Sequence, residues 1–190
     1  MSNKQFMMLS IAFFMSFSTG LLVKAARSTT TTIEQRFRPK LPKIAFVPSS
    51  FRTGPLEVAK VFGRAKGCER ATPELIQAVS DESVLHGIDP RIAAATLAIE
   101  SSCNPYAVSV RGAVGLMQIT PKTWSDKYDF TKTYNLLNLH DNVQVGISIL
   151  ADMIHTYGER EGVRRYQGLG VGCSTCDGAY TDKIMGLAVR

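Results

Sequence analysis

The stretch ESSCNPYAVSVRGAVGLMQITPKTW, which runs from Glu100 to Trp124, decides how this sequence folds. It follows an apolar segment, residues 91–99, for which Asp89 is a good N-cap and Pro90 fits the first turn of a helix. The sequence therefore predicts an apolar helix that ends at Glu100. Apolar surroundings raise the pKa of a carboxyl group, which suits a general acid that works near neutral pH. The alternative is that Glu100 is only the polar end of a core helix.

Short motifs follow one another in this stretch. They are Glu-Ser at Glu100 and Ser101, Asn-Pro-Tyr-Ala at residues 104–107, and Gly-Leu-Met-Gln at residues 115–118. Further on lie NVQVGISIL at residues 142–150 and Arg-Tyr-Gln-Gly at residues 165–168. In this order the motifs resemble the catalytic core of the soluble lytic transglycosylases, which are relatives of goose-type lysozyme. The resemblance covers roughly Glu69 to Lys183. Gln167 departs from the family, which usually has Asn there.

The resemblance implies an all-α, lysozyme-like domain with a small loop or irregular β region beside the active-site groove. The local pattern also predicts helices. One is bounded by Thr72 and Gly87, a short one lies at residues 120–124, a longer one at about residues 141–157, and the last near residues 177–189. The buried stripe of the longer helix is expected to consist of Val143, Ile147, Leu150 and Ile154.

Length and charge suggest one domain with appendages. Residues 1–25 predict a secretory signal, residues 26–67 a basic linker containing Pro and Thr, and residues 68–190 the catalytic domain. The linker has nine Lys or Arg against two Asp or Glu, whereas residues 68–190 have eleven against fourteen. The net charge of +6 therefore does not come from the folded domain, and the pattern gives no reason to expect nucleic acid as a partner.

The signal predicts export across the inner membrane to the periplasm or the cell exterior. Lys4 supplies a positive start, residues 6–23 are almost uncharged and apolar, and residues 23–25 have small side chains around a cleavage point. An uncleaved signal anchor is the alternative, and the membrane would then be contacted through this segment alone.

Four cysteines fit export, because disulfides form in oxidising compartments. Cys68, Cys103, Cys173 and Cys176 allow three pairings, and the sequence does not choose among them. Cys103 follows Glu100 by three residues, so a disulfide there would hold the end of the helix that carries the acid. A redox pair or half of a zinc site are weaker interpretations of the Cys-x-x-Cys spacing. We expect no metal and no cofactor.

The mechanism is suggested by a missing residue type. No Asp or Glu occurs between Ser101 and Ser125, although ordinary glycosidases place two carboxylates at the scissile bond. The resemblance implies that the N-acetyl group of the substrate takes the second role. Glu100 would first protonate the glycosidic oxygen and would then accept the proton of the 6-hydroxyl as a 1,6-anhydro ring closes.

The resemblance also implies substrate-binding residues. Ser101 is expected near the acetamido group, Gln118 on a sugar amide or hydroxyl, and Met117 on a sugar face, with core filler as the alternative for Met117. Gly115 is expected to let the backbone approach the glycan. Tyr166 is expected to hydrogen-bond Glu100, with a half-buried core aromatic as its alternative. No chemistry is expected of Trp124, Tyr180 or Lys183.

These observations predict a peptidoglycan lytic transglycosylase that acts on glycan strands at the β-1,4 bond between N-acetylmuramic acid and N-acetylglucosamine. One rival is a hydrolytic lysozyme in which Asp126, Asp129 or another carboxylate positions water. A second rival is a glycan-binding module without turnover. Wall growth, a secretion or conjugation apparatus as partner, and a phage all suit such an enzyme, and the sequence does not choose among them.

Overall fold

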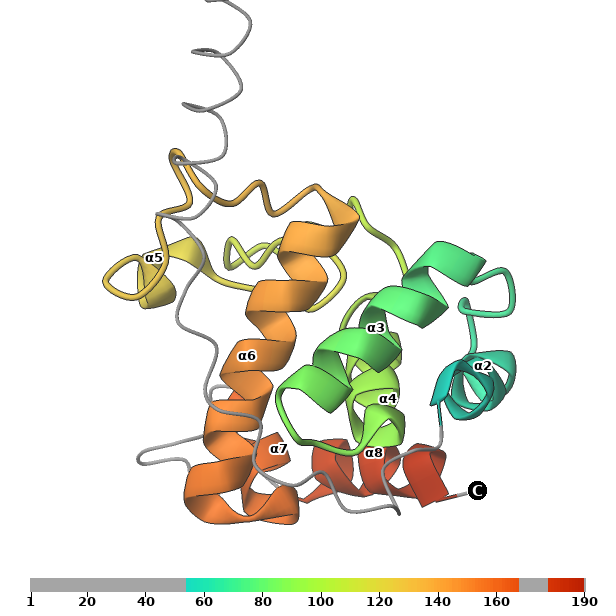
Figure 1. Cartoon of the computed structure of the whole chain (residues 1–190). Helices are drawn as coiled ribbons and strands as arrows, with labels where there is room; N and C mark the ends of the chain where they lie inside the picture. Colours follow the sequence, from blue (N-terminus) through green and yellow to red (C-terminus); the bar gives the residue numbers. More distant parts are fainter. Residues whose placement is uncertain (1–53, 168–177, 190) are drawn as a thin grey trace, which may run out of the picture. The chain divides into compact units, whose positions relative to one another are not determined.

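The computed structural model describes residues 54–167 and 178–189, and within these ranges the protein consists of seven α-helices without a β-sheet (Figure 1). The helices are α2 (Gly54–Arg64), α3 (Pro73–Leu85), α4 (Pro90–Ser101), α5 (Pro121–Trp124), α6 (Leu139–Tyr157), α7 (Glu159–Tyr166) and α8 (Ala179–Val189). The prediction of an all-α fold is confirmed. The predicted signal, residues 1–25, and residues 26–53 of the predicted linker lie outside the described residues.

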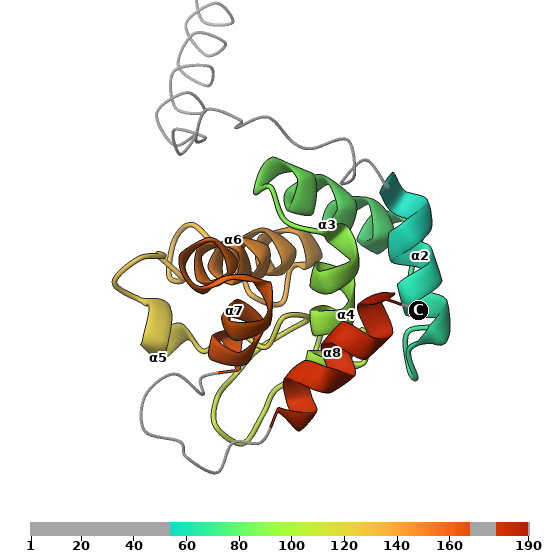
Figure 2. The ribbon, with the colours of Figure 1, turned by 90° about the horizontal axis from the view of Figure 1, so that it is seen from below.

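Helix α4 forms the centre of the fold. It packs against α2, α3 and α8, and Figure 2 shows it between α3 and α8. Every residue from Ile92 to Ala98 is buried, and several of them are alanines, which let neighbouring helices approach closely. A helix that is apolar on all sides is a helix of the core. The end of α4 is therefore held firmly from several directions.

Caps at their N-termini explain where α3 and α4 begin. The Thr72 side chain accepts a hydrogen bond from the backbone amide of Leu75 at 3.2 Å, and Asp89 accepts one from Arg91 at 2.8 Å. A proline follows each cap at the first helical position, where it costs no hydrogen bond. Both helices begin where the sequence predicted.

Helix α6 supplies the other half of the core by packing against α3 and α7. Its predicted stripe of Val143, Ile147, Leu150 and Ile154 is buried, as expected. The segment between α4 and α6 is mostly irregular. It contains isolated antiparallel bridges that pair Val114 with Val108 and with Ile119, which agrees with the predicted irregular β region.

Two helices were not predicted. Helix α2 lies inside residues 26–67, the segment predicted as a linker, yet Val58, Val61 and Phe62 are fully buried against the rest of the core. These residues are spaced as one helical face, a signal that the many cations of the segment obscured. Helix α7 is rich in charge and has only Gly162 and Val163 buried, so its sequence alone resembles a loop.

No helix in the described part of the chain combines the length and the apolar character needed to cross a membrane.

Candidate active site

Glu100 lies in the last turn of α4 and is partly buried. Burial raises the pKa of its carboxyl group above the ordinary value, and a hydrogen bond from Tyr180 lowers it by a smaller amount. The hydroxyl of Tyr180 donates to Oε1 of Glu100 from α8. Burial and the nearby Glu100 charge raise the pKa of Tyr180, so this phenol remains a donor. The acid is therefore both desolvated and oriented.

The position of Tyr166 differs from the prediction. Its hydroxyl donates to the backbone carbonyl of Met117 at 2.8 Å, whereas the donor to Glu100 is Tyr180, for which the sequence suggested no chemistry. Tyr166 and Glu100 line the same cavity, and burial followed by the Glu100 charge raises the pKa of Tyr166. Tyr180 is 80 residues from Glu100, and only the packing of α8 against α4 brings the two together.

A cavity of about 630 Å³ opens beside Glu100. Its walls come from the irregular segment after α4, from α5, and from one end of α6 and α7. They include Glu100, Ser109, Arg111, Gln118, Trp124, Tyr157, Arg165, Tyr166 and Gln167. Among the described residues that line it, Glu100 is the only carboxylate. The cavity thus offers one acid and a set of hydrogen-bonding and aromatic side chains, which suits a carbohydrate.

The acids considered for a water-positioning role lie elsewhere. Asp129 is exposed and accepts hydrogen bonds from the Thr131 hydroxyl at 2.6 Å and from the Thr131 amide at 2.9 Å. These bonds lower its pKa, and its side chain borders a different hollow. Asp126 is exposed and is also absent from the cavity wall. Neither residue is placed to activate water beside Glu100 in this structure.

The predicted role of Ser101 does not fit its orientation. Its hydroxyl donates back to the Leu97 carbonyl at 3.3 Å, and Ser101 is not part of the cavity wall. Successive residues on an α-helix point in directions about 100° apart, so the neighbour of Glu100 faces another way. The serine that does line the cavity is Ser109, which the sequence analysis missed. Its position depends on the chain turning back after α4.

Gly115 and Met117 stabilise the loop that carries the Gly-Leu-Met-Gln motif. Gly115 has φ +77°, and a Cβ atom there would lie 2.1 Å from Nδ2 of Asn142 and 2.5 Å from the Leu136 carbonyl. Met117 is fully buried, and its Cβ packs against Gly146 of α6. Neither residue lines the cavity. The absence of a Cβ atom at Gly115 thus makes room for Asn142, and Met117 fills the core.

Gln118 is the residue of this loop that was expected to hold a sugar amide or hydroxyl. It lines the cavity, has φ +48°, and its side-chain amide donates to the carbonyls of Ala107 at 3.1 Å and Gly115 at 2.9 Å. These bonds fix the side chain at the edge of the cavity. Trp124, expected in the core, packs against the core and also borders the cavity.

A disulfide joins Cys68, which follows α2, to Cys103, which follows α4. The chain leaves α4 through Ser102 and Cys103, both with positive φ, and then turns. The bond therefore anchors the segment directly after α4 to the segment that follows α2, as one of the open pairings suggested. Cys173, Cys176 and Gly168 lie outside the described residues.

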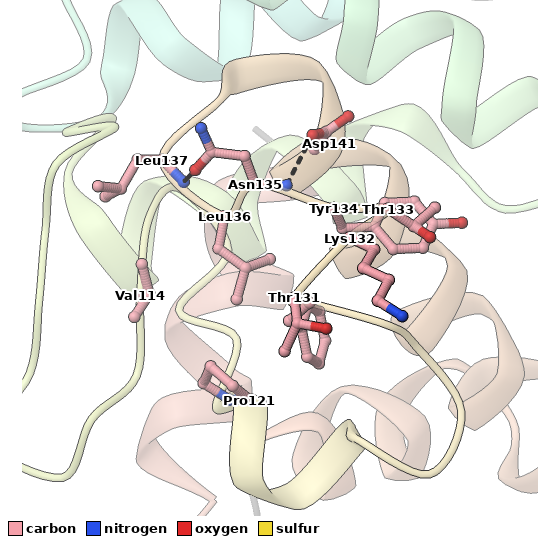
Figure 3. A pocket seen from close by; sticks show the side chains of 11 residues that line it. Val114, Pro121, Thr131, Lys132, Thr133, Tyr134, Asn135, Leu136, Leu137 and Asp141 are labelled. Atoms are coloured by element: carbon pink, nitrogen blue, oxygen red, sulfur yellow. Dashed lines mark hydrogen bonds between the residues drawn. The ribbon is translucent and has the colours of Figure 1, made fainter.

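A second cavity, of about 490 Å³, lies under the loop at residues 130–137 (Figure 3). Its charged side chains are Lys132 and Asp141. Asp141 accepts a hydrogen bond from the Asn135 amide at 2.8 Å, and Asn135 in turn accepts one from the Leu137 amide at 3.1 Å. The acid of this cavity thus holds the loop in place, and Glu100 is not part of it.

A central helix carries one partly buried glutamate in its last turn, beside a cavity whose described lining has no second carboxylate, and this arrangement is the one expected of a lysozyme-like domain of the transglycosylase type. Comparison with known families agrees, since residues 77–169 match the family described as "Transglycosylase SLT domain". Residues 77–169 therefore form a transglycosylase SLT domain, as the sequence resemblance predicted.

Several curated proteins are similar over part of this chain. A "Transglycosylase" of Enterobacteria phage PRD1 is 31% identical over 86 residues, which is 44% of this chain and 30% of the relative. An "Endo-type membrane-bound lytic murein transglycosylase A" of Citrobacter koseri is 37% identical over 79 residues, covering 36% of this chain and 37% of the relative. A protein of the same name from Klebsiella pneumoniae (strain 342) is 57% identical over 37 residues, covering 20% and 18%. The chain thus spans well under half the length of these relatives. No solved structure matches significantly.

Proposed function

We propose that this protein is a peptidoglycan lytic transglycosylase that cleaves the β-1,4 bond between N-acetylmuramic acid and N-acetylglucosamine and leaves a 1,6-anhydro end. The observation that carries the proposal is Glu100, a partly buried acid in a cavity whose described lining has no other carboxylate. The names of the relatives from Citrobacter and Klebsiella, which are lytic murein transglycosylases, support the same activity.

Glu100 has two tasks in this reaction. In the first step its protonated carboxyl group gives a proton to the glycosidic oxygen, and the raised pKa keeps a supply of the protonated form near neutral pH. The acetamido group of the muramyl residue stabilises the positive charge that develops on the sugar. In the second step the Glu100 carboxylate takes the proton of the 6-hydroxyl, whose oxygen closes the anhydro ring.

The surroundings of Glu100 serve these two tasks in opposite ways. Burial favours the protonated acid of the first step, whereas the Tyr180 hydroxyl donates to Oε1 and stabilises the carboxylate of the second step. Gln118 and Tyr166 line the same cavity and are proposed to contact the sugars. Ser101, Gly115 and Met117, which were expected to do so, are not among the described residues that line the cavity, so they are not part of this proposal.

The test is mass spectrometry of the fragments that the oxidised protein releases from purified peptidoglycan. Glu100→Gln keeps the size of the side chain but cannot cycle a proton, so turnover should fall by at least about a thousandfold. Glu159→Gln is the matched control, because Glu159 is exposed and is not part of the cavity wall. It should release fragments at the wild-type rate.

The products separate the candidate functions. Anhydro-muramyl ends, one water lighter than reducing ends, support the transglycosylase. Reducing ends would instead assign a hydrolytic lysozyme, and intact turnover in Glu100→Gln would remove Glu100 from the chemistry. Binding of strands without release of any fragment would indicate a glycan-binding module.

We also propose that the protein works in the cell envelope after export. The Cys68–Cys103 disulfide supports this, because such bonds persist in oxidising compartments. Peptidoglycan strands are the proposed partner. A role beside a secretion or conjugation apparatus remains part of this proposal, and it is tested by asking whether loss of the protein blocks assembly of such an apparatus.

A further inference from the structure

The cavity that holds Glu100 is positively charged on its walls. Arg111 and Arg165 line it, and Glu100, whose pKa is raised, is the only acid among the described lining residues. A cavity with this balance attracts anions. The sugar rings and hydroxyl groups of a glycan strand are neutral. The proposed cleavage reaction therefore does not by itself explain why two arginines line the cavity.

One of the two arginines is already engaged. The guanidinium of Arg165 lies 3.9 Å from the centre of the Tyr157 ring, and its Nε donates to Glu161 at 2.7 Å. These contacts fix Arg165 on the wall and neutralise part of its charge. Arg165 therefore contributes positive charge to the cavity wall, but its guanidinium is already occupied by these contacts.

Arg111 differs because its backbone is fixed while its side chain is free. It sits in a tight turn in which Gly112 donates to the Ser109 carbonyl at 3.0 Å, and the Ala113 amide donates to the Ser109 hydroxyl at 3.0 Å. Within residues 54–167 and 178–189, the guanidinium of Arg111 has no hydrogen-bond or ion-pair partner. The turn thus places the five N–H donors of the Arg111 guanidinium at the edge of the cavity.

Arg111 also does not serve the acid. The pKa of Glu100 is raised by burial and lowered by the Tyr180 hydrogen bond, and neither arginine contributes. Because Arg111 lines the cavity and has no partner among the described residues, its charge is available for a ligand that enters.

We propose that Arg111 determines specificity by binding a carboxylate of the peptide that branches from the muramyl residue. This inference rests on the proposed function, since that branch is where a peptidoglycan strand carries its negative charge. A guanidinium grips a carboxylate through two parallel hydrogen bonds, which a lysine cannot reproduce. The protein would then prefer strands that keep their peptides. The same chemistry is offered by the lactyl carboxylate of a strand that has lost its peptide, so the experiment separates the two sources.

The dissociation constants of three soluble strands of equal length provide the test. The first bears peptides, the second has been stripped to free lactyl carboxylates, and the third has those carboxylates capped as neutral methylamides. Binding is measured by calorimetry in the Glu100→Gln background, which prevents turnover. Adding Arg111→Gln should weaken binding of the peptide-bearing strand about tenfold, or about 1.4 kcal/mol, and leave the methylamide strand within about twofold.

Two further variants control for charge and geometry. Lys122→Gln removes the same charge from an exposed site outside this cavity, and it should not discriminate among the strands. Arg111→Lys keeps the charge but loses the paired donors, so its loss should be intermediate. Raising the salt concentration should shrink the Arg111 effect, because the residue is exposed. Thermal unfolding of each variant confirms that the fold is retained.

Each outcome decides the matter. A loss confined to the peptide-bearing strand supports the proposal. A loss on the stripped strand that disappears on the methylamide would overturn the peptide assignment in favour of the lactyl carboxylate. Equal loss on all three strands, or none on the first, would also overturn it. Release of anhydro ends by the protein with Glu100 intact is scored separately, so failure of the proposed function is distinguishable from failure of this inference.

Discussion

Asn142 connects the Gly-Leu-Met-Gln loop to α6, and replacing it tests how the candidate site is held. The amide of Met117 donates to its Oδ1 at 2.8 Å, and its Nδ2 donates to the carbonyls of Leu136 at 2.8 Å and Val114 at 3.0 Å. Only 1% of Asn142 is exposed. Asn142→Ala removes all three bonds, and each buried group left unpaired costs about 1–3 kcal/mol. Allowing for water that enters the space, we expect a loss of about 3–5 kcal/mol, a large share of the ~5–15 kcal/mol of an ordinary domain.

Urea unfolding at equilibrium, followed by the fluorescence of the single tryptophan, Trp124, measures this loss. The midpoint should fall while the slope stays constant, because the exposed surface on unfolding is unchanged. Asn138→Ala is the matched control. Asn138 caps α6 from an exposed position by accepting a bond from Asp141 at 3.1 Å, and its loss should cost about 1 kcal/mol. If Asn142→Ala costs no more than this control, the three bonds do not hold the loop and the reasoning is wrong.

Four further outcomes are expected. Tyr180→Phe removes the donor that lowers the pKa of Glu100, so the alkaline limb of the activity profile should move to higher pH, which a pH series of kcat/KM detects. The stability of Glu100→Gln relative to wild type should increase as pH rises. The pKa of the Glu100 carboxyl group is raised in the folded state, so wild type loses stability as pH rises through that pKa, whereas Gln does not titrate. Urea midpoints at several pH values measure this difference. Tyr166→Phe should lower turnover less than Glu100→Gln, because it loses one bond to a backbone carbonyl, and rates on purified strands measure the difference. Replacing Cys68 and Cys103 together by serine should cost about 3–4 kcal/mol, given the 35-residue separation, in the same urea assay.

The sequence predicted those parts of the fold that are determined locally. Thr72 and Asp89 are capping residues followed by proline, so the starts of α3 and α4 could be read directly. The buried stripe of α6 follows from its spacing. Helix α2 was missed, because its cations suggested a solvated linker, and its stability comes from burying Val58 and Phe62 against other helices. Local pattern does not reveal which neighbours a short helix will find.

The candidate site divides in the same way. Glu100 was predicted because it ends an apolar helix and is followed by motifs that resemble a family whose acid lies at this position. The residue that donates to Glu100 could not be predicted, because Tyr180 reaches Glu100 only after α8 packs on α4. The family motif pointed to Tyr166 instead. Ser101 was expected at the substrate because of the family motif, whereas in this structure its hydroxyl donates back to the Leu97 carbonyl, because adjacent residues on a helix face different ways.

The architecture around Glu100 suits the two proton transfers that we propose for this single carboxylate. A fully desolvated carboxyl group would have a high pKa and would therefore be a weak proton donor in the first step. A fully solvated one would have a low pKa and would already be ionised before the first step. The carboxyl group avoids both limits, because the core of α4 raises its pKa while Tyr180 restrains that rise. Burial, which raises the pKa, comes from α4, and the hydrogen bond that lowers it comes from Tyr180 on α8. A substitution on one helix can therefore change one effect without the other. The Cys68–Cys103 bond anchors the segment that directly follows α4, the helix from which the acid projects.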